Sequence, residues 1–391
     1  MRWAIGSGTV LGWLLAATVL WRADVGETGD GPVRFDTDVL ERAEAYARGA
    51  RLLWLAGVVV ELAVLAALVP HGPRLARRAR GPSVVRGLQV LLVVLAAVWL
   101  ARLPVAVAAQ WWRRRYGLSD AGYLDPLVLN PWLELLGSVV LACVALAAGM
   151  LLARHFGRRW WLVGAPALVV VGAASVLLQP LVLAPKLDRL EDPALAAEIR
   201  ALGDRLGVKV DRVEVRRASE RTTRVNAEVY GLGATRTVVL WDTLLDGRYT
   251  EDEIRFLAAH ELAHVQAHHV WKGLGWLVLL APPLVWILSR AARLEDPGQV
   301  PRAVLVVVLL QLAVLPLTNV VSRRYEAEAD HLGLQATREP AAAEATFRRF
   351  VRTNLNDPSP PAWARILLAT HPTTEDRIRA ARSSAAPPAG S

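Results

Sequence analysis

The chain contains little of several residues that commonly build functional sites. Its 391 residues include one cysteine, Cys143, so no disulfide can form within the chain and a cysteine-based metal site is excluded. Histidine occurs only eight times, so a regular spacing of histidines is informative. Arginine carries almost all of the net charge of +9, because lysine is confined to Lys186, Lys209 and Lys272.

The arginines do not have the pattern of a nucleic-acid-binding surface. Many lie in short loops between apolar runs, for example at residues 74–80 and 113–115. Positive charge is common at such flanks of membrane segments, whereas a nucleic-acid binder collects its charge on a soluble face. We therefore expect a lipid bilayer, and no nucleic acid, as a partner of the chain.

Long apolar runs predict a membrane protein. Hydrophobic residues make up 54% of the sequence and the mean hydropathy is +0.31, both high for a soluble protein. A bilayer-spanning helix needs roughly 18 residues. The apolar runs that reach this length are residues 3–21, 52–69, 84–109, 132–153, 160–183, 271–288 and 304–321. The first run could instead be a cleaved signal peptide, because Ala16 and Ala17 are small, but its length favours an uncleaved helix.

Two charged segments interrupt the apolar pattern and predict a soluble domain built in two pieces. The expected fold is mainly α, a multi-pass helical membrane protein of about seven spans with a small α+β domain. The predicted order is residues 1–184 with about five transmembrane helices, 185–270 of the soluble domain, 271–321 with helices six and seven, 322–382 of the soluble domain, and 383–391 as a disordered tail.

The clearest chemical motif is the pentapeptide at residues 260–264, which reads His-Glu-Leu-Ala-His. Histidines four residues apart lie one turn apart on the same helix face. His260 and His264 can therefore bind one zinc ion together, while Glu261 can take a proton from a water that the metal polarises. The alternative is a buried helix that contains two histidines by chance, which is uncommon in a chain so poor in histidine.

The flanking residues place this pentapeptide in a helix over residues 251 to about 270. Thr250 is a suitable N-cap, and Glu253 follows at the spacing of a capping box. Apolar residues recur on one side of this run, as in a helix that packs against a core. The sequence thus predicts a well-defined helix that presents both histidines on one face.

A small sheet is predicted upstream of this helix. Asp192-Pro193 and Gly207 have the character of the start and the end of an earlier helix. Residues rich in β-branched and aromatic side chains follow, and they predict strands over residues 210–215, 226–231 and 237–241.

A catalytic zinc site usually takes a third protein ligand, and residues 322–330 offer candidates. This stretch is expected to be a helix in which Glu326 and Asp330 share one face. Glu326 could bind the zinc, and Asp330 could hydrogen-bond a histidine ligand and fix its tautomer. Glu328 lies well round the helix and is the poorer candidate. An exposed, charged helix start is the alternative for the whole stretch.

The other histidines do not have the spacing of a second metal site. His268 and His269 follow the pentapeptide at the expected boundary between water and membrane, where we expect them to be solvated. His371 precedes a proline, and taken alone it has only the character of a loop residue.

Together these motifs resemble those of the type I CAAX prenyl proteases. That family consists of seven-span membrane zinc metalloendopeptidases related to heat-shock-induced membrane proteases of bacteria. The resemblance covers the soluble segments well and the seven-span plan loosely. Its specific marks are His260–His264, Ser-Arg-x-x-Glu-x-x-x-Asp at 322–330, Asn226-Ala227 followed by residues 237–245, Gln179-Pro180 through Pro185, and His371-Pro372 followed by Arg377.

The resemblance implies a zincin-like catalytic domain with one Zn²⁺ per chain. The metal ligands would be His260, His264 and Glu326, and Glu261 would be the general base. Asp330 would support a zinc ligand through a hydrogen bond.

The resemblance also implies roles for two further parts of the chain. His371 and Arg377 would stabilise the oxyanion of the tetrahedral intermediate. Asn226 and Ala227 would belong to an edge strand that binds the backbone of a protein or peptide substrate, which an exposed edge can do without reading sequence.

The predicted function is a membrane zinc metalloendopeptidase that acts on membrane-associated or unfolded proteins. The preference for arginine over lysine suggests a GC-rich bacterial genome, and hence a bacterial cell membrane, where farnesylated CAAX substrates are not expected. CAAX-type processing of lipidated C-termini and a non-catalytic membrane scaffold are the alternatives. The family places the catalytic domain on the cytoplasmic side, whereas the acidic loop 22–49 and the basic loops favour the outer side.

Overall fold

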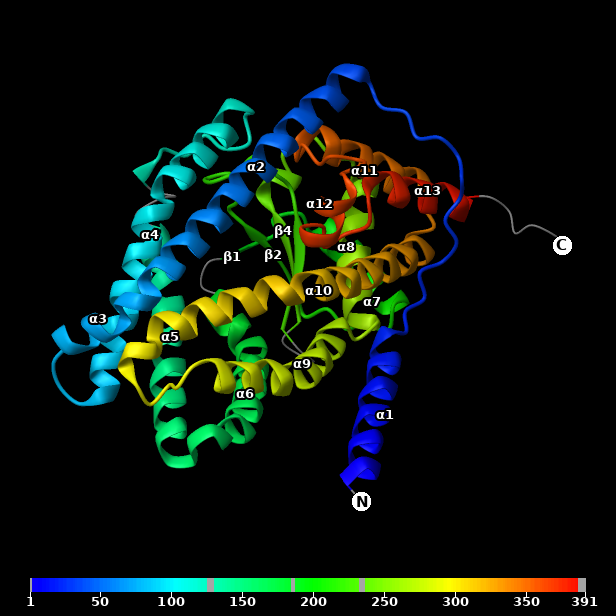
Figure 1. Cartoon of the computed structure of the whole chain (residues 1–391). Coiled ribbons are helices and arrows are strands. Elements are labelled where there is room, and N and C mark those ends of the chain that lie inside the picture. The colour runs from blue at the N-terminus through cyan, green and yellow to red at the C-terminus, as the bar shows by residue number, and fades with distance from the viewer. Residues whose placement is uncertain (1, 125–129, 184–186, 232–235, 386–391) are drawn as a thin grey trace. The chain divides into compact units, whose positions relative to one another are not determined.

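The computed structural model describes residues 2–124, 130–183, 187–231 and 236–385 of the chain (Figure 1). Most of these residues are helical. The longer helices are α1 (Arg2–Trp21), α2 (Thr37–Leu68), α4 (Ser83–Arg115), α5 (Asn130–Phe156), α6 (Trp161–Leu183), α9 (His269–Ala291) and α10 (Val300–Thr337). The shorter helices are α3 (Gly72–Arg78), α7 (Pro193–Arg205), α8 (Glu251–Gln266), α11 (Pro340–Thr353), α12 (Ala362–Leu367) and α13 (Thr374–Ala385).

The chain divides into two units, which are described separately. The helical unit comprises residues 48–171 and 280–314, and the sheet-containing unit comprises residues 1–47, 172–279 and 315–391. The division predicted from the sequence follows the ends of the apolar runs rather than packing, and it stays a prediction.

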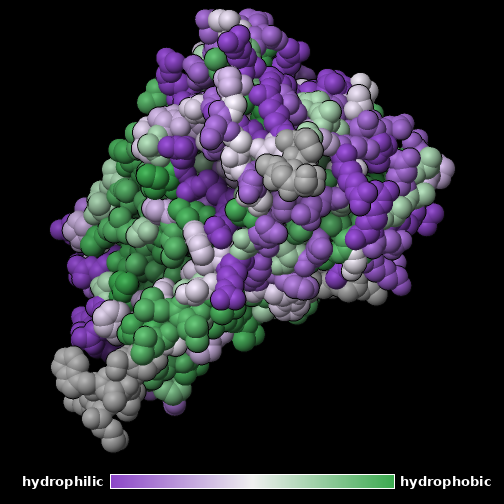
Figure 2. Space-filling model, turned by 90° about the vertical axis from the view of Figure 1, so that its right-hand side faces the viewer, coloured by the Kyte–Doolittle hydropathy of each residue, from purple (hydrophilic) through white to green (hydrophobic). Residues whose placement is uncertain are grey.

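Membrane-length helices confirm the predicted multi-pass fold. Among the described residues, six segments are long and apolar enough to cross a membrane: residues 37–78, 83–115, 138–159, 161–178, 269–291 and 297–337. The apolar helical segment Val10–Trp21, which belongs to the first predicted crossing, is shorter. In Figure 2 hydrophobic side chains gather in one region of the surface and hydrophilic side chains in another, as expected of a protein that is partly immersed in lipid.

The helical unit has an apolar core and carries an ion pair between two of its long helices. The core is formed by Leu65, Ala76, Val90, Leu91, Val94 and Val300. Nη1 of Arg102 on α4 donates to Oε2 of Glu61 on α2 at 2.7 Å. Both groups interrupt apolar runs, and charges in such segments are tolerated when they pair within the protein.

The sheet-containing unit holds a four-stranded sheet in the order β1-β2-β4-β3. The strands are β1 (Leu187–Arg189), β2 (Arg212–Arg216), β3 (Ala227–Tyr230) and β4 (Thr237–Trp241). β2 and β4 are parallel, whereas β1 pairs antiparallel with β2 and β3 pairs antiparallel with β4. The three predicted strands are confirmed, and β3 lies at an edge of the sheet. The short strand β1 was not predicted, because three residues with two charges have no β pattern.

The core of this unit lies between the sheet and helices α7, α8, α11 and α13. Buried residues from all of these elements form one cluster, including Ile199 on α7, Leu240 on β4, Phe256 on α8, Phe347 on α11 and Ile378 on α13. The rings of Phe256 and Phe347 meet edge to face, with centroids 5.4 Å apart. The core thereby fixes α8, the helix that carries the pentapeptide, against the sheet.

The local signals read from the sequence around α7 and α8 are confirmed. Asp192 caps α7 by accepting from the backbone N–H groups of Ala194 and Leu195. Thr250 and Glu253 form the predicted capping box at the start of α8. α8 ends at Gln266 rather than near residue 270, because His268 adopts a positive φ of 56° and α9 begins at His269.

Two further differences from the predicted elements concern α10 and the C-terminus. α10 runs without interruption through the apolar residues 304–321 and the charged stretch 322–330, so one helix joins the predicted seventh crossing to the third-ligand candidates (Figure 1). α13 continues to Ala385, so residues 383–385 of the predicted tail are helical. Residues 386–391, and residues 184–186 at the end of the predicted Gln179–Pro185 motif, lie outside the described part of the chain.

Candidate active site

α8 presents the two histidines of the pentapeptide to one point. His260 and His264 lie one turn apart, with ring centroids 4.9 Å apart and Nε2 atoms 3.2 Å apart. His260 is buried and His264 partly buried. The predicted pairing of these side chains on one helix face is therefore present in the structure.

α10 supplies the carboxylate that completes this group. Oε2 of Glu326 lies 3.2 Å from Nε2 of His260, and Oε1 lies 3.5 Å from Nε2 of His264. The close approach of the two helices depends on Gly333, where an added Cβ would lie 3.2 Å from the backbone N and 3.3 Å from the Cα of His260. A glycine three residues after Asp330 thus allows the charged stretch of α10 to reach α8.

The donor set fits a zinc ion. One ligand atom from each of His260, His264 and Glu326 can be chosen so that all lie within 4.8 Å of one another. Two imidazole nitrogens and one carboxylate oxygen form a common set of protein ligands in catalytic zinc sites, which leave a further position open. The two Nε2 atoms lie 3.2 Å apart, close enough for both to contact one metal ion.

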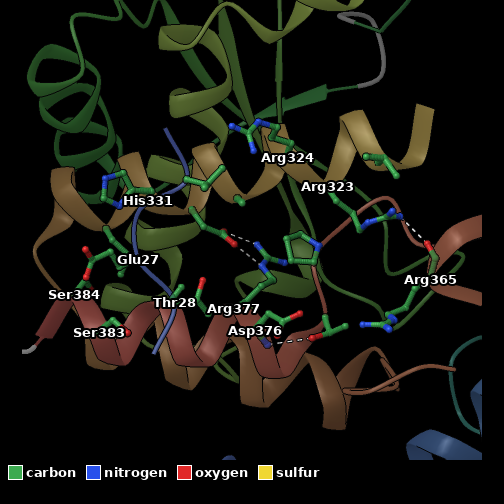
Figure 3. A pocket seen from close by; sticks show the side chains of 18 of the residues that line it. Glu27, Thr28, Arg323, Arg324, His331, Arg365, Asp376, Arg377, Ser383 and Ser384 are labelled. Atoms are coloured by element: carbon green, nitrogen blue, oxygen red, sulfur yellow. Dashed lines mark hydrogen bonds and ion pairs between the residues drawn. The ribbon is translucent and has the colours of Figure 1, made fainter. Parts of the chain in front are cut away.

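A carboxylate and a guanidinium support His260 from behind. Oδ1 of Asp330 lies 2.9 Å from Nδ1 of His260. Nε and Nη2 of Arg377 on α13 each donate to Asp330 at 2.7 Å, which is a bidentate pair. Figure 3 shows Arg377 extending from α13 toward α10. The guanidinium also lies over the ring of Phe347, 4.2 Å from its centroid. The contact between Asp330 and His260 has the geometry expected from the sequence, and the role of Asp330 at a zinc ligand stays a prediction.

A different group supports His264, and here the sequence prediction is wrong. His269 was expected to be solvated, but it is buried, and its Nδ1 lies 2.7 Å from Nδ1 of His264. Its Nε2 lies 2.8 Å from Oε2 of Glu328, which also accepts from Nζ of Lys272 at 3.0 Å. Glu328 is thus buried in this group rather than near the three ligand atoms. The spacing of five residues between His264 and His269 carries no helical signal, so periodicity alone could not indicate the contact.

The surroundings shift the pKa values of His260 and Glu261 for different reasons. Burial alone would lower the pKa of His260, but hydrogen bonds to Asp330 and Glu326 outweigh it and raise the pKa to about 10. Burial raises the pKa of Glu261, and the neighbouring His260 and His264 oppose this shift. A carboxylate with a raised pKa is a better proton acceptor near neutral pH than an ordinary glutamate.

A loop from the C-terminal segment brings His371 to the site. Nε2 of His371 lies 3.1 Å from Oε2 of Glu326, and the ring is half exposed. Arg323 of α10 holds the preceding residues by donating to the backbone oxygens of Arg365 and Ala369, at 2.6 and 2.7 Å (Figure 3). A loop histidine with no local signal thus reaches the ligand carboxylate. Its role on an oxyanion, and that of Arg377, stay predictions.

The edge strand β3 lies beside α8. Ala227 is buried in the core and Asn226 is exposed at the start of the strand, where its carbonyl accepts from the backbone N–H of Trp241 at 3.1 Å. Glu228 of β3 is close enough to Glu261 to contribute to its raised pKa. The geometry places an edge strand next to the pentapeptide helix, and binding of substrate to it stays a prediction.

Comparison with known proteins identifies the family. The profile of peptidase family M48 matches residues 189–385, which is half of the chain. The chain belongs to peptidase family M48. Its resemblance to the CAAX prenyl proteases, stated above from motifs, is thereby confirmed at the level of the family.

Curated relatives of this M48 protein differ in how much of the chain they match. It is 29% identical over 278 residues to a Bacillus subtilis protein named "Uncharacterized metalloprotease YhfN", and this match covers 67% of the chain and 64% of the relative. It is 36% identical over 107 residues to CAAX prenyl protease 1 of Saccharomyces cerevisiae, and this match covers 26% of the chain and 23% of the relative. The matched region is therefore less than two thirds of either relative.

A solved structure shares the fold of nearly the whole chain. The crystal structure of S. mikatae Ste24p superposes with a TM-score of 0.77 and 19% sequence identity, over 96% of this chain and 98% of that one. At this identity the likeness shows the fold, which extends over the membrane helices as well as the sheet and the site.

Proposed function

We propose that this M48 protein is a membrane-embedded zinc metalloendopeptidase. The observation that carries the proposal is the meeting of His260, His264 and Glu326 at one point, with a glutamate of raised pKa next to the first histidine. This is the donor set and the base that hydrolysis of a peptide bond by a zinc site requires.

The residues of the chain take distinct roles in this proposal. When bound, zinc would polarise the scissile carbonyl and the attacking water. Glu261 accepts a proton from that water and passes it to the leaving amine. His371 is the candidate to stabilise the developing oxyanion directly, because its half-exposed ring lies 3.1 Å from Glu326. Arg377 is buried and bound to Asp330, so it would act on the reaction only indirectly, through Asp330 and His260.

The proposed substrate is a membrane-associated or unfolded protein. The edge strand β3 supports this, because main-chain pairing along Asn226 and Ala227 would hold any extended segment beside α8. The multi-pass fold supports a substrate delivered at the membrane. CAAX-type processing of lipidated C-termini is the alternative that the named relatives favour. We further propose a bacterial cell membrane as the location, with arginine-rich composition as its support.

The proposal is tested with detergent-purified protein and a matched pair of variants on α8. Glu261→Gln removes the base, and Glu251→Gln removes an exposed carboxylate from the first turn of the same helix. Zinc per chain and cleavage of casein are measured for both variants and for the wild type. We expect zinc in all three proteins and cleavage by the wild type and Glu251→Gln only.

Other outcomes separate the alternatives. Cleavage by Glu261→Gln protein would overturn the assignment of the base. Zinc in all three with no cleavage of casein, but cleavage of a prenylated peptide over its unprenylated form, would establish the CAAX-type reaction. Absence of zinc from the wild type, after purification without chelator and addition of zinc, would favour a non-catalytic scaffold.

A further inference from the structure

The polar group behind His264 is not used by the reaction described above. It consists of His269, Glu328 and Lys272, joined by contacts of 2.8 Å and 3.0 Å. His269 and Glu328 are each only 8% exposed. Burying an imidazole and a carboxylate costs free energy unless each finds partners. A helix junction could be filled more simply by apolar side chains, so the choice of these residues calls for a functional reason.

The backbone is shaped to bring His269 to His264. In a continuous helix a residue five positions on lies about 140° round the axis and cannot face its partner. The left-handed conformation of His268 ends α8 and starts α9 in a new direction. His269 consequently turns back so that its Nδ1 meets Nδ1 of His264 at 2.7 Å.

One arrangement of protons satisfies every contact in this group. If Nε2 of His264 faces the metal, then its Nδ1 carries the hydrogen and donates. Nδ1 of His269 must then accept, which leaves the hydrogen of the neutral ring on Nε2, where it donates to Glu328. Glu328 accepts in addition from Lys272 and, at 3.1 Å through Oε1, from the backbone N–H of Asp24.

The ring of His269 is also fixed in orientation. It stacks on Tyr325 with centroids 4.5 Å apart and an angle of 13° between the planes. Tyr325 is itself held by Nε1 of Trp276, which donates to its hydroxyl at 3.0 Å. Stacking leaves His269 little freedom to rotate away from His264, so the acceptor at Nδ1 is held in place before metal binds.

We propose that His269 is a positioning residue for the zinc ligand His264, and that Glu328 and Lys272 fix the tautomer of His269. The inference rests on the proposed function, because it assumes that His264 binds zinc. A hydrogen bond to the far nitrogen of a ligand histidine orients the ring and raises its basicity, and losing such a bond typically weakens metal affinity by about 10- to 100-fold.

The test compares three variants at the end of α8. His269→Phe keeps a ring that can stack on Tyr325 and removes both nitrogens. His269→Asn keeps a side-chain oxygen that can accept near the position of Nδ1. His268→Asn is the matched control, because His268 is the exposed neighbour and asparagine tolerates its left-handed backbone. Zinc dissociation constants are measured by competition with a chromophoric chelator, and Co²⁺-loaded protein is examined by visible absorption.

The expected result is a dissociation constant about 10- to 100-fold higher for His269→Phe, with an altered Co²⁺ spectrum. His269→Asn should recover most of the affinity, and His268→Asn should match the wild type. The melting temperature of the metal-free proteins shows whether each variant folds. If His269→Phe does not fold, the zinc affinity of His269→Asn decides, compared with that of the wild type and of a His264→Ala variant.

Two failures can be told apart. Wild-type protein that does not bind zinc overturns the proposed function and this inference with it. Zinc bound by the wild type and by folded His269→Phe with the same affinity and the same Co²⁺ spectrum overturns the inference alone. If His269→Phe does not fold, a His269→Asn affinity as low as that of a His264→Ala variant also overturns it, because the retained acceptor would then have no effect.

Discussion

The two histidines of the proposed metal site are supported in two different ways. His260 contacts a carboxylate directly, since Nδ1 meets Asp330, which Arg377 holds through two hydrogen bonds. His264 contacts a second imidazole, and the carboxylate of Glu328 comes one step further away. Each series of contacts ends in a cation. Behind His260 it is the buried Arg377, and behind His264 it is the partly exposed Lys272.

The difference shows which parts of the fold each ligand depends on. The support of His260 comes from α10 and α13, so it requires the C-terminal segment to be folded. The support of His264 comes from the start of α9, from α10 and from the backbone at Asp24, which follows α1. Metal affinity is therefore expected to depend on both ends of the chain, through separate contacts.

The largest effect is expected from breaking the arginine end of the first support. Arg377→Met leaves the Asp330 carboxylate buried without its cation, and removing one partner of a buried ion pair typically costs about 3–5 kcal/mol. Lys272→Met removes the matching cation of the second support, but Glu328 keeps its contacts with His269 and with the backbone N–H of Asp24, so a smaller loss of stability is expected. Denaturant unfolding in detergent measures both.

The control for this comparison removes both charges of the first support. Arg377→Met combined with Asp330→Leu takes away the unpaired carboxylate, and such replacements are often close to neutral for stability. Recovery of stability in the double variant would confirm that Arg377→Met loses stability because it leaves the Asp330 carboxylate buried without a cation. A Lys272→Met variant that loses as much stability as Arg377→Met would remove the proposed difference between the supports.

The next effect concerns metal affinity. Asp330→Asn keeps the size of the side chain but removes the charge next to His260, and about a 10- to 100-fold loss of zinc affinity is expected. Glu328→Gln makes the same change one step further from the metal, so the loss should be smaller. Chelator competition ranks the two variants, and equal losses would show that distance from the ligand does not matter here.

The pH dependence of zinc affinity tests the environment of His260. The pKa of His260 is raised to about 10 in the metal-free chain, so near neutral pH a proton must leave before zinc can bind. Because the protonated form dominates below that pKa, zinc affinity should rise with pH, by about tenfold for each unit between roughly pH 7 and 9. Asp330→Asn lowers the pKa of His260 by removing the negative charge that stabilises the protonated ring, so the slope of zinc affinity against pH should be shallower in this variant. An unchanged slope would contradict this assignment.

The sequence predicts the part of the site that lies within single helices. His260, Glu261 and His264 follow from spacing on α8, and Glu326 with Asp330 follow from spacing on α10. The capping box predicts where α8 begins. The structure shows these residues on the expected helix faces, because a helix has a fixed period and positions along it determine the face that each residue occupies. Their roles stay predictions.

The sequence does not predict contacts that depend on a break in that period. His269 faces His264 only because His268 takes a positive φ, which is uncommon for a residue other than glycine. The partners Lys272 and Glu328 are 56 residues apart, and no local pattern joins them. Arg377 could be named by resemblance, but its bidentate contact with Asp330 required the packing of α13 to be known.

The smallest expected effect tests the contact that both supports share, which is the approach of α10 to α8 at Gly333. An added Cβ there would lie 3.2 Å from the backbone N of His260, tighter than most van der Waals contacts, and neither backbone can move away cheaply. Gly333→Ala should therefore shift α10 by a few tenths of an ångström, and overpacking of this kind typically costs about 1–3 kcal/mol.

Alanine also favours a helix over glycine by up to about 1 kcal/mol, so the net change in unfolding free energy should be small. Zinc affinity should fall by a few-fold, because Glu326, Asp330 and Glu328 all move relative to α8. Gly273→Ala on α9 is the matched control, since an added Cβ there meets nothing within 4 Å. The two variants share the gain in helix propensity and differ only in the contact. Equal zinc affinities would show that the site tolerates a displacement of α10, and that each support adjusts with the helix.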